Sequence, residues 1–168
     1  MEQDSLLYNF LDDCAAHLPR FPDGRINFKG AKKAPGLACF VRFQSKILLL
    51  KRSDKVGSGK GKWYCVAGYL DEYKPIKEKV LEELREELGI GEDNLQNLVF
   101  FDPWEQHDEA SGMRWTHFPV LVDLKKLPQI TLDWEHTEYK WVLPEDIGRF
   151  DVLESLWMNL KRVTKRLD

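Results

Sequence analysis

The chain has 168 residues, with 25 lysines and arginines against 28 aspartates and glutamates, so its formal charge is −3 when the histidines are neutral. This length fits one domain and can bury a hydrophobic core without disulfides or structural metals. The mild acidity argues against binding nucleic acid in bulk, because domains that do so are usually strongly basic. With 43% hydrophobic and 32% charged residues, the composition is that of a globular protein and not of a disordered chain.

The chain also lacks the features of a membrane or secreted protein. No apolar run approaches the roughly 20 residues that cross a bilayer, and the N-terminal MEQDSLLYNF has acids where a signal peptide has basic residues. The three cysteines, Cys14, Cys39 and Cys65, lack the spacing of a zinc or redox motif. Cys39 and Cys65 lie in apolar runs, which predicts buried thiols. We therefore expect a cytoplasmic protein without a membrane partner.

The predicted elements alternate between helices and strands. Residues 4–18 have helical spacing of apolar residues, and a basic, glycine-containing arm follows at 25–36. Strands are expected at 37–43 and 46–51, joined by a two-residue turn, and at 63–67, 98–101, 115–122 and 139–142. Further helices are expected at 75–88 and 150–163, the first of them ended by Gly89. This order predicts an α/β domain with a mixed sheet and helices on both faces.

Three glutamates, Glu83, Glu86 and Glu87, follow one edge of the apolar stripe of the helix at 75–88. Glu87 overlaps that stripe, so we expect it to be partly buried. Several glutamates of this helix are four residues apart, and each such pair costs roughly 0.2–0.5 kcal/mol in an isolated helix. A bound Mg²⁺ or Mn²⁺ accounts for this arrangement better than a solvated acidic face, because these ions prefer oxygen ligands.

The segment around these glutamates resembles the signature of the Nudix hydrolase family. That signature is Gly, five residues, Glu, seven residues, Arg-Glu-apolar, any residue, Glu-Glu, any residue, Gly-apolar. Seven of its nine positions match here: Gly68, Glu83, Leu84, Glu86, Glu87, Gly89 and Ile90. The resemblance implies a Nudix-type α/β/α sandwich. Residues 1–34 would be an N-terminal helix and arm, and residues 35–168 the Nudix domain of a single-domain protein.

The resemblance also implies an activity and a cofactor. The activity is Mg²⁺-dependent hydrolysis of the diphosphate linkage in a small-molecule nucleoside diphosphate derivative, with Mn²⁺ as a substitute metal. The implied metal ligands are the carboxylates of Glu83, Glu86, Glu87 and Glu135 and the backbone carbonyl of Ala67, and the four glutamates are the implied catalytic residues. A homodimer is left open, because many relatives dimerise.

Two signature positions depart from the family pattern, since Lys74 stands where the family has Glu and Glu82 where it has Arg. In the family these two residues are understood to pair and to brace the loop against the helix. Both signs are reversed here, which predicts an ion pair of opposite polarity between Lys74 and Glu82. The alternative is that both positions have drifted and the site is weakened.

A second resemblance lies at residues 133–142, DWEHTEYKWV. It is similar to the stretch Glu-His-x-x-Tyr-x-Trp of diadenosine tetraphosphate hydrolases and related nucleotide pyrophosphohydrolases. The Glu of that stretch, which approaches the metal as a ligand or base, maps onto Glu135. Glu138 is a second candidate, for contact with the substrate. The alternative for both is a surface loop before an edge strand.

Other candidate substrate residues are basic or aromatic. Lys51, Arg52, Lys60 and Lys62 lie on or beside the loop SDKVGSGKGK, which is not a Walker motif because it lacks the final Ser or Thr. Trp104 and Trp115 are candidates for stacking on a nucleobase. The alternative for each lysine is a solvated side chain, and for each tryptophan a packing role.

Other functions stay open beside hydrolysis. The first is a non-catalytic Nudix module that binds a nucleotide or a protein, which the departures at 74 and 82 keep open. A weaker one is an enzyme like isopentenyl-diphosphate isomerase, whose Cys- and Glu-containing pattern we do not find. The last is a plain acidic scaffold helix without a site.

Overall fold

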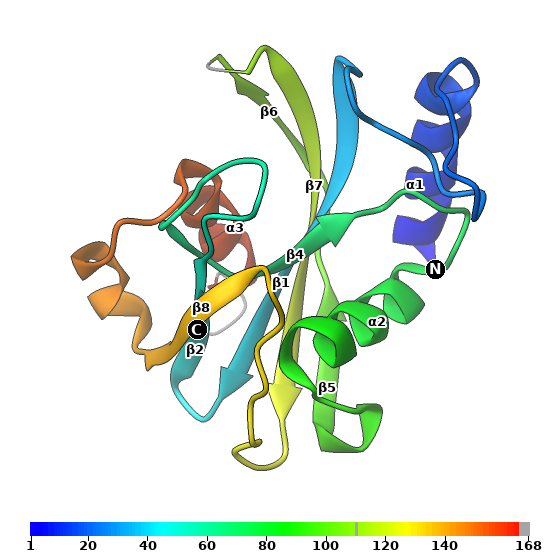
Figure 1. The fold of residues 1–168 in the computed structure, drawn as a ribbon. Coiled ribbons are helices and arrows are strands. Elements are labelled where there is room, and N and C mark those ends of the chain that lie inside the picture. Colours follow the sequence, from blue (N-terminus) through cyan, green and yellow to red (C-terminus); the bar gives the residue numbers. More distant parts are fainter. Residues whose placement is uncertain (110, 165–168) are drawn as a thin grey trace.

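The computed structural model describes residues 1–109 and 111–164 as an eight-stranded sheet with helices on both faces (Figure 1). The helices are α1 (Glu2–Ala15), α2 (Ile76–Leu88) and α3 (Glu154–Thr164), with the 3₁₀ turns η1 (Glu92–Asn94) and η2 (Pro144–Arg149). The strands are β1 (Lys33–Phe43), β2 (Lys46–Arg52), β3 (Trp63–Tyr64), β4 (Val66–Tyr69), β5 (Leu95–Phe100), β6 (Trp104–Asp108), β7 (Met113–Leu124) and β8 (His136–Val142).

The long strands β1 and β7 form the centre of a mixed sheet. They run parallel over ten residue pairs, from Lys33 opposite Arg114 to Arg42 opposite Asp123. All the other pairings are antiparallel: β1 with β2 and β4, β2 with β3 and β8, and β7 with β5 and β6. The expected mixed sheet is therefore confirmed.

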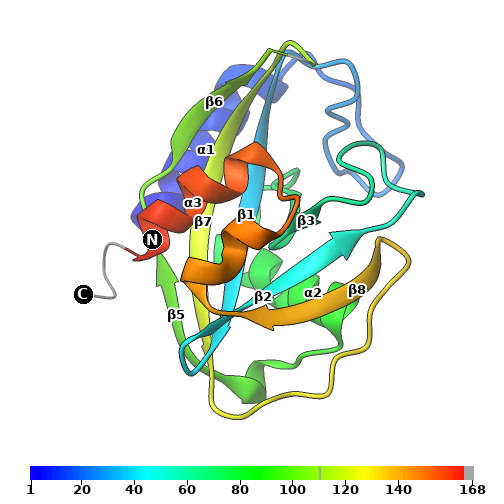
Figure 2. The ribbon, with the colours of Figure 1, turned by 90° about the vertical axis from the view of Figure 1, so that its left-hand side faces the viewer.

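Alternation along β1 supplies two separate hydrophobic cores. Leu37, Cys39 and Val41 pack in one core with α1 and α2, whereas Ala38 and Phe40 pack in the other with α3. Figure 2 shows α3 in front of the sheet and α1 and α2 behind it. Cys39 and Cys65 are buried free thiols, as expected. No helix in the described parts of the chain is long and apolar enough to cross a membrane.

Several element boundaries differ from the sequence expectations. Strand β6 was not expected, because its sequence WEQHD is polar and pairs with β7 alone. The arm expected at 25–36 already becomes β1 at Lys33, where β7 supplies a partner strand. The closing helix begins at Glu154 instead of residue 150, because the chain before it first pairs with Trp63 of β3 through Val152.

Candidate active site

Helix α2 is held against the sheet by an apolar stripe that carries the acidic residues with it. Ile76, Val80, Leu84 and Leu88 are fully buried on this stripe. The helix ends at Gly89, whose φ of 70° is a left-handed conformation that favours glycine. Because this stripe is packed against the sheet, the signature glutamates of α2 lie next to β4.

The three signature glutamates of α2 differ in exposure. Glu83 and Glu87, one helical turn apart, are only 8% and 2% exposed, whereas Glu86 is exposed. The expectation that Glu87 is partly buried is thus exceeded. Two carboxyl groups so deep in the protein need a proton, a cation or hydrogen-bond donors beside them.

The carboxylate of Glu83 is pressed against the backbone of β4. A Cβ atom at Gly68 would collide with Oε1 of Glu83, so glycine is required there for steric reasons. The ammonium of Lys79 lies 2.9 Å from the same oxygen. Burial raises the pKa of Glu83, and Lys79 opposes this shift.

Glu87 carries a buried oxygen without a hydrogen-bond partner, Oε2. Burial raises the pKa of Glu87 well above its usual range, and the charges of Glu83, Glu135 and Asp133 add to this. The nearest basic group is Nε2 of His136, 3.8 Å from Oε2. Burial lowers the pKa of His136, which favours the neutral ring.

The neutral ring of His136 has its proton on the opposite nitrogen. Nδ1 lies 3.1 Å from Oδ1 of Asp133, and a carboxylate can only accept, so Nδ1 is the donor. Nε2 then turns a lone pair towards the unpaired oxygen of Glu87. This arrangement of lone pairs suits a proton or a cation placed among them.

Glu135 joins this cluster from the loop before β8. Its side chain is half-buried, and its pKa is raised by burial and by the charges of Asp133 and Glu83. The loop is fixed by Ser53, whose N–H donates to the Glu135 carbonyl at 2.7 Å. The structure therefore brings Glu135 near the glutamates of α2, although almost fifty residues separate them.

This donor set fits a hard divalent cation. Carboxylates provide the oxygen ligands that Mg²⁺ and Mn²⁺ prefer, and one buried oxygen lacks any partner. The Ala67 carbonyl belongs to the same region, on β4 directly before Gly68. Among residues 1–109 and 111–164, no three acidic, His or Cys side chains are already grouped closely enough to ligate one ion.

The predicted ion pair of reversed polarity is confirmed. Nζ of Lys74 lies 3.0 Å from Oε2 of Glu82 and 3.2 Å from Oε1 of Glu72. Burial works against both charges, but the pair with Lys74 holds the pKa of Glu82 below its usual value. The loop after β4 is thus tied to α2 at the two positions that depart from the signature.

The basic candidates lie in different surroundings. Arg52 lies close enough to Glu135 that its positive charge opposes the rise that burial causes in the pKa of this glutamate. The Nε of Arg52 donates to the Ser58 carbonyl. Lys51 pairs with Glu138 across β2 and β8 at 2.8 Å, so these two candidates contact each other. Lys62 pairs with Asp151, and Lys60 is exposed.

The two candidate tryptophans belong to one row of rings, which runs from Tyr69 through Trp115 and His117 to Trp104. The ring centroids of Trp115 and Tyr69 are 5.4 Å apart, and those of Trp104 and His117 are 4.8 Å apart. Trp104 is held on its other sides by the Asn159 side chain and the Arg162 guanidinium. Tyr69 was not predicted as a candidate, although it directly follows Gly68 of the signature.

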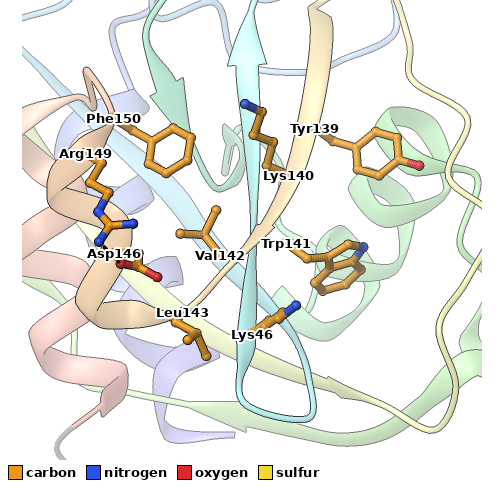
Figure 3. Close-up of a pocket in the computed structure, with 9 residues that line it drawn as sticks. All are labelled: Lys46, Tyr139, Lys140, Trp141, Val142, Leu143, Asp146, Arg149 and Phe150. Carbon is orange, nitrogen blue, oxygen red and sulfur yellow. Dashed lines mark ion pairs between the residues drawn. The ribbon is translucent and has the colours of Figure 1, made fainter.

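An open hollow of about 540 Å³ lies elsewhere, between β8 and η2 (Figure 3). In Figure 3, Lys140, Val142 and Phe150 lie on one side of β8, and Tyr139 and Trp141 lie on the other. None of the clustered glutamates lines it. The acidic cluster is therefore distinct from this hollow.

Sequence reasoning did not assign roles to three residues that contact the cluster. Asp133 and His136 stand in the quoted segment DWEH, where the pattern drew attention to Glu135 alone. Lys79 stands one helical turn before Glu83, a spacing that places the two side chains together. Its burial, however, depends on the loop after β4, which helical spacing does not reveal.

Comparisons with known proteins found related sequences and related folds. A family model for the NUDIX domain matches residues 32–167. Nucleoside triphosphatase NudI of Escherichia coli O17:K52:H18 is 28% identical over 121 residues, which cover 67% of this chain and 83% of NudI.

Two solved structures share the fold. A MutT NUDIX hydrolase from Burkholderia pseudomallei has a TM-score of 0.64 at 22% identity, covering 79% of this chain and 98% of its own. The NUDIX domain of Shewanella oneidensis NrtR, complexed with ADP ribose, has a TM-score of 0.68 at 15% identity, covering 84% and 94%.

Proposed function

Because this chain belongs to the Nudix family of hydrolases, we propose that it uses Mg²⁺ to hydrolyse the diphosphate linkage of a nucleoside diphosphate joined to a second group. Mn²⁺ is the expected substitute. The observation that carries the proposal is the buried pair Glu83 and Glu87 with the half-buried Glu135 near them, in which one oxygen of Glu87 has no partner. The relative NudI, named as a nucleoside triphosphatase, supports nucleotides as the substrate class.

The residues that would hold the metal are Glu83, Glu86, Glu87 and Glu135, together with the Ala67 carbonyl. A bound ion would neutralise phosphate charge and lower the pKa of the attacking water. Binding a cation would also offset the mutual repulsion of these carboxylates, which raises the pKa of Glu87 and Glu135 in the protein alone.

A glutamate of the cluster would accept the proton of the water. Glu135 suits this role, because its side chain is only half-buried and a water molecule can reach it. Glu83 is the other candidate, but Lys79 already occupies one of its oxygens. Arg52, whose charge acts on Glu135, would contact a phosphate group, and the exposed Lys60 of the neighbouring loop would be a second contact.

The non-catalytic alternative is weakened by the ion pair between Lys74 and Glu82. The departures from the signature at these two positions are its main support, yet the contact between loop and helix is present with the charges exchanged. All the glutamates of the expected ligand set are retained as well. This combination favours an active hydrolase over a module that only binds nucleotides.

The test is a substrate panel with Mg²⁺ or Mn²⁺. It comprises nucleoside triphosphates, dinucleoside polyphosphates, nucleotide sugars, ADP-ribose and NADH, with products separated by chromatography. We expect the wild type to release a phosphate-containing product from at least one compound, and only with the metal. Glu83→Gln should lower this rate at least about hundredfold. Cleavage that is insensitive to a chelator would contradict the proposal.

A further inference from the structure

Lys79 is a buried lysine within the acidic surface of α2. It is only 8% exposed, and its ammonium lies 2.9 Å from Oε1 of Glu83 and 3.8 Å from Oε2 of Glu82. Lys77, two residues earlier, is about half exposed and pairs with Glu92 at the surface. The two lysines of one helix therefore differ in surroundings, and only Lys79 reaches the glutamate cluster.

Lys79 is surrounded by acids from two elements. Glu82 and Glu83 belong to its own helix, and the third acid, Asp71, belongs to the loop after β4. Burial raises the pKa of Asp71, and the positive charge of Lys79 opposes this rise. Oδ1 of Asp71 is buried without a hydrogen-bond partner, and Oδ2 lies 3.8 Å from the Arg25 guanidinium. Lys79 thus supplies positive charge at the point where the loop, the helix and the cluster meet.

The contact with Lys79 restricts the orientation of the Glu83 carboxylate. Oε1 of Glu83 lies between the Lys79 ammonium and the backbone of Gly68. The contact with Gly68 is so close that a methyl group on its Cα would collide with this oxygen. The Glu87 carboxyl group lies beside Glu83, one turn along the helix, close enough for the two to share a proton. A carboxylate held on both sides cannot rotate freely.

We propose that Lys79 is a positioning residue for the hydrolysis, holding Glu83 in the orientation that the reaction needs. The inference rests on the proposed function. It assigns Lys79 no contact with substrate, because its ammonium is enclosed by the acids around it. Lys79 acts through Glu83, and its removal leaves a buried carboxylate without the cation that fixes it.

The test compares Lys79→Met, which keeps the aliphatic stem without the charge, with Lys79→Arg, which keeps the charge. Lys77→Met is the matched control on the same helix. For hydrolysis, we expect Lys79→Met to lower kcat at least about tenfold with KM changed less than about threefold. Lys79→Arg should recover a large part of kcat, and Lys77→Met should behave as the wild type.

A second measurement follows unfolding of the metal-free protein and needs no activity. Lys79→Met, Glu83→Gln and the double variant form a cycle in which the unfolding equilibrium constant is measured by urea titration. We expect Lys79→Met to raise that constant much less in the Glu83→Gln background than in the wild type, with a coupling of about tenfold or more. A protein without hydrolytic activity would fail the proposed function, yet this cycle would still report the contact.

Three outcomes would overturn the inference. Additive effects in the cycle would mean that Lys79 and Glu83 do not interact in solution. Strong coupling with an unchanged kcat in Lys79→Met would mean that the contact serves stability alone. A Lys79→Arg variant as slow as Lys79→Met would show that the positive charge at position 79 is not what sustains kcat.

Discussion

The contact between Gly68 and Glu83 gives the most local prediction. A methyl group at position 68 would collide with the Glu83 carboxylate, so Gly68→Ala must displace it. We expect hydrolysis to fall at least about hundredfold, because a small displacement of a catalytic group is costly. Gly57→Ala is the control, since nothing lies within 4 Å of its added methyl and its φ is not positive. Equal activity of both variants would contradict the role assigned to this contact.

The ion pair between Lys74 and Glu82 gives the second prediction. Lys74→Glu would place a third carboxylate beside Glu72 and Glu82, and we expect a loss of about 1–2 kcal/mol in unfolding free energy. Adding Glu82→Arg should restore most of the stability, because the pair then has the polarity of the family signature. Urea unfolding of the single and double variants measures this. Additive losses would rule out a compensated pair.

His117 gives the prediction on pH. Burial, with the charge of Arg162, lowers the pKa of His117 from 6.5 to about 4. As the pH falls from about 6.5 towards about 4, His117 becomes protonated in the unfolded chain while it stays neutral in the folded protein. Stability therefore drops, by about 3 kcal/mol at most from this residue.

The pH dependence of stability in His117→Gln tests that assignment. The amide keeps a hydrogen-bonding group near Gln106, which lies 2.9 Å from the histidine ring, but it does not titrate. The unfolding free energy of this variant should fall less than that of the wild type between about pH 7 and about pH 4.5. Parallel curves for the two proteins would show that His117 titrates normally.

At the scale of elements, the sequence was most informative where one element carries its own pattern. The spacing of glutamates and leucines in α2 predicted the helix, its Gly89 end and the burial of Glu87 together. Strand β6 was not predicted because its sequence, WEQHD, is mostly polar. It forms a strand by pairing with β7, which lies later in the chain. Secondary structure that depends on a partner strand leaves a weak local signal.

The acidic cluster divides in the same way. The glutamates of α2 come from one helix, so helical spacing alone puts them side by side. Glu135 was reached only by resemblance to a known stretch, and its neighbours Asp133 and His136 were not assigned. Their contact with α2 depends on the pairing of β8 with β2, which spans most of the chain.

At the scale of the molecule, the net charge of −3 gives little guidance about phosphate chemistry. Five of the 28 acidic residues lie between positions 78 and 87. Two of these, Glu83 and Glu87, are buried in the cluster. A cation held there would convert a negative surface into one that accepts phosphate, which the whole-chain charge does not reveal.

Metal binding by the whole protein tests this account most directly, through the unfolding midpoint measured against Mg²⁺ or Mn²⁺ concentration. The wild-type midpoint should rise by roughly 5–10 °C at about one hundred times the dissociation constant. Glu87→Gln should lose this response and unfold at a higher temperature than the wild type without metal, because it removes a buried acid. Glu78→Gln, an exposed glutamate of the same helix, should respond as the wild type does. A wild-type midpoint that does not move with either metal would contradict the central claim.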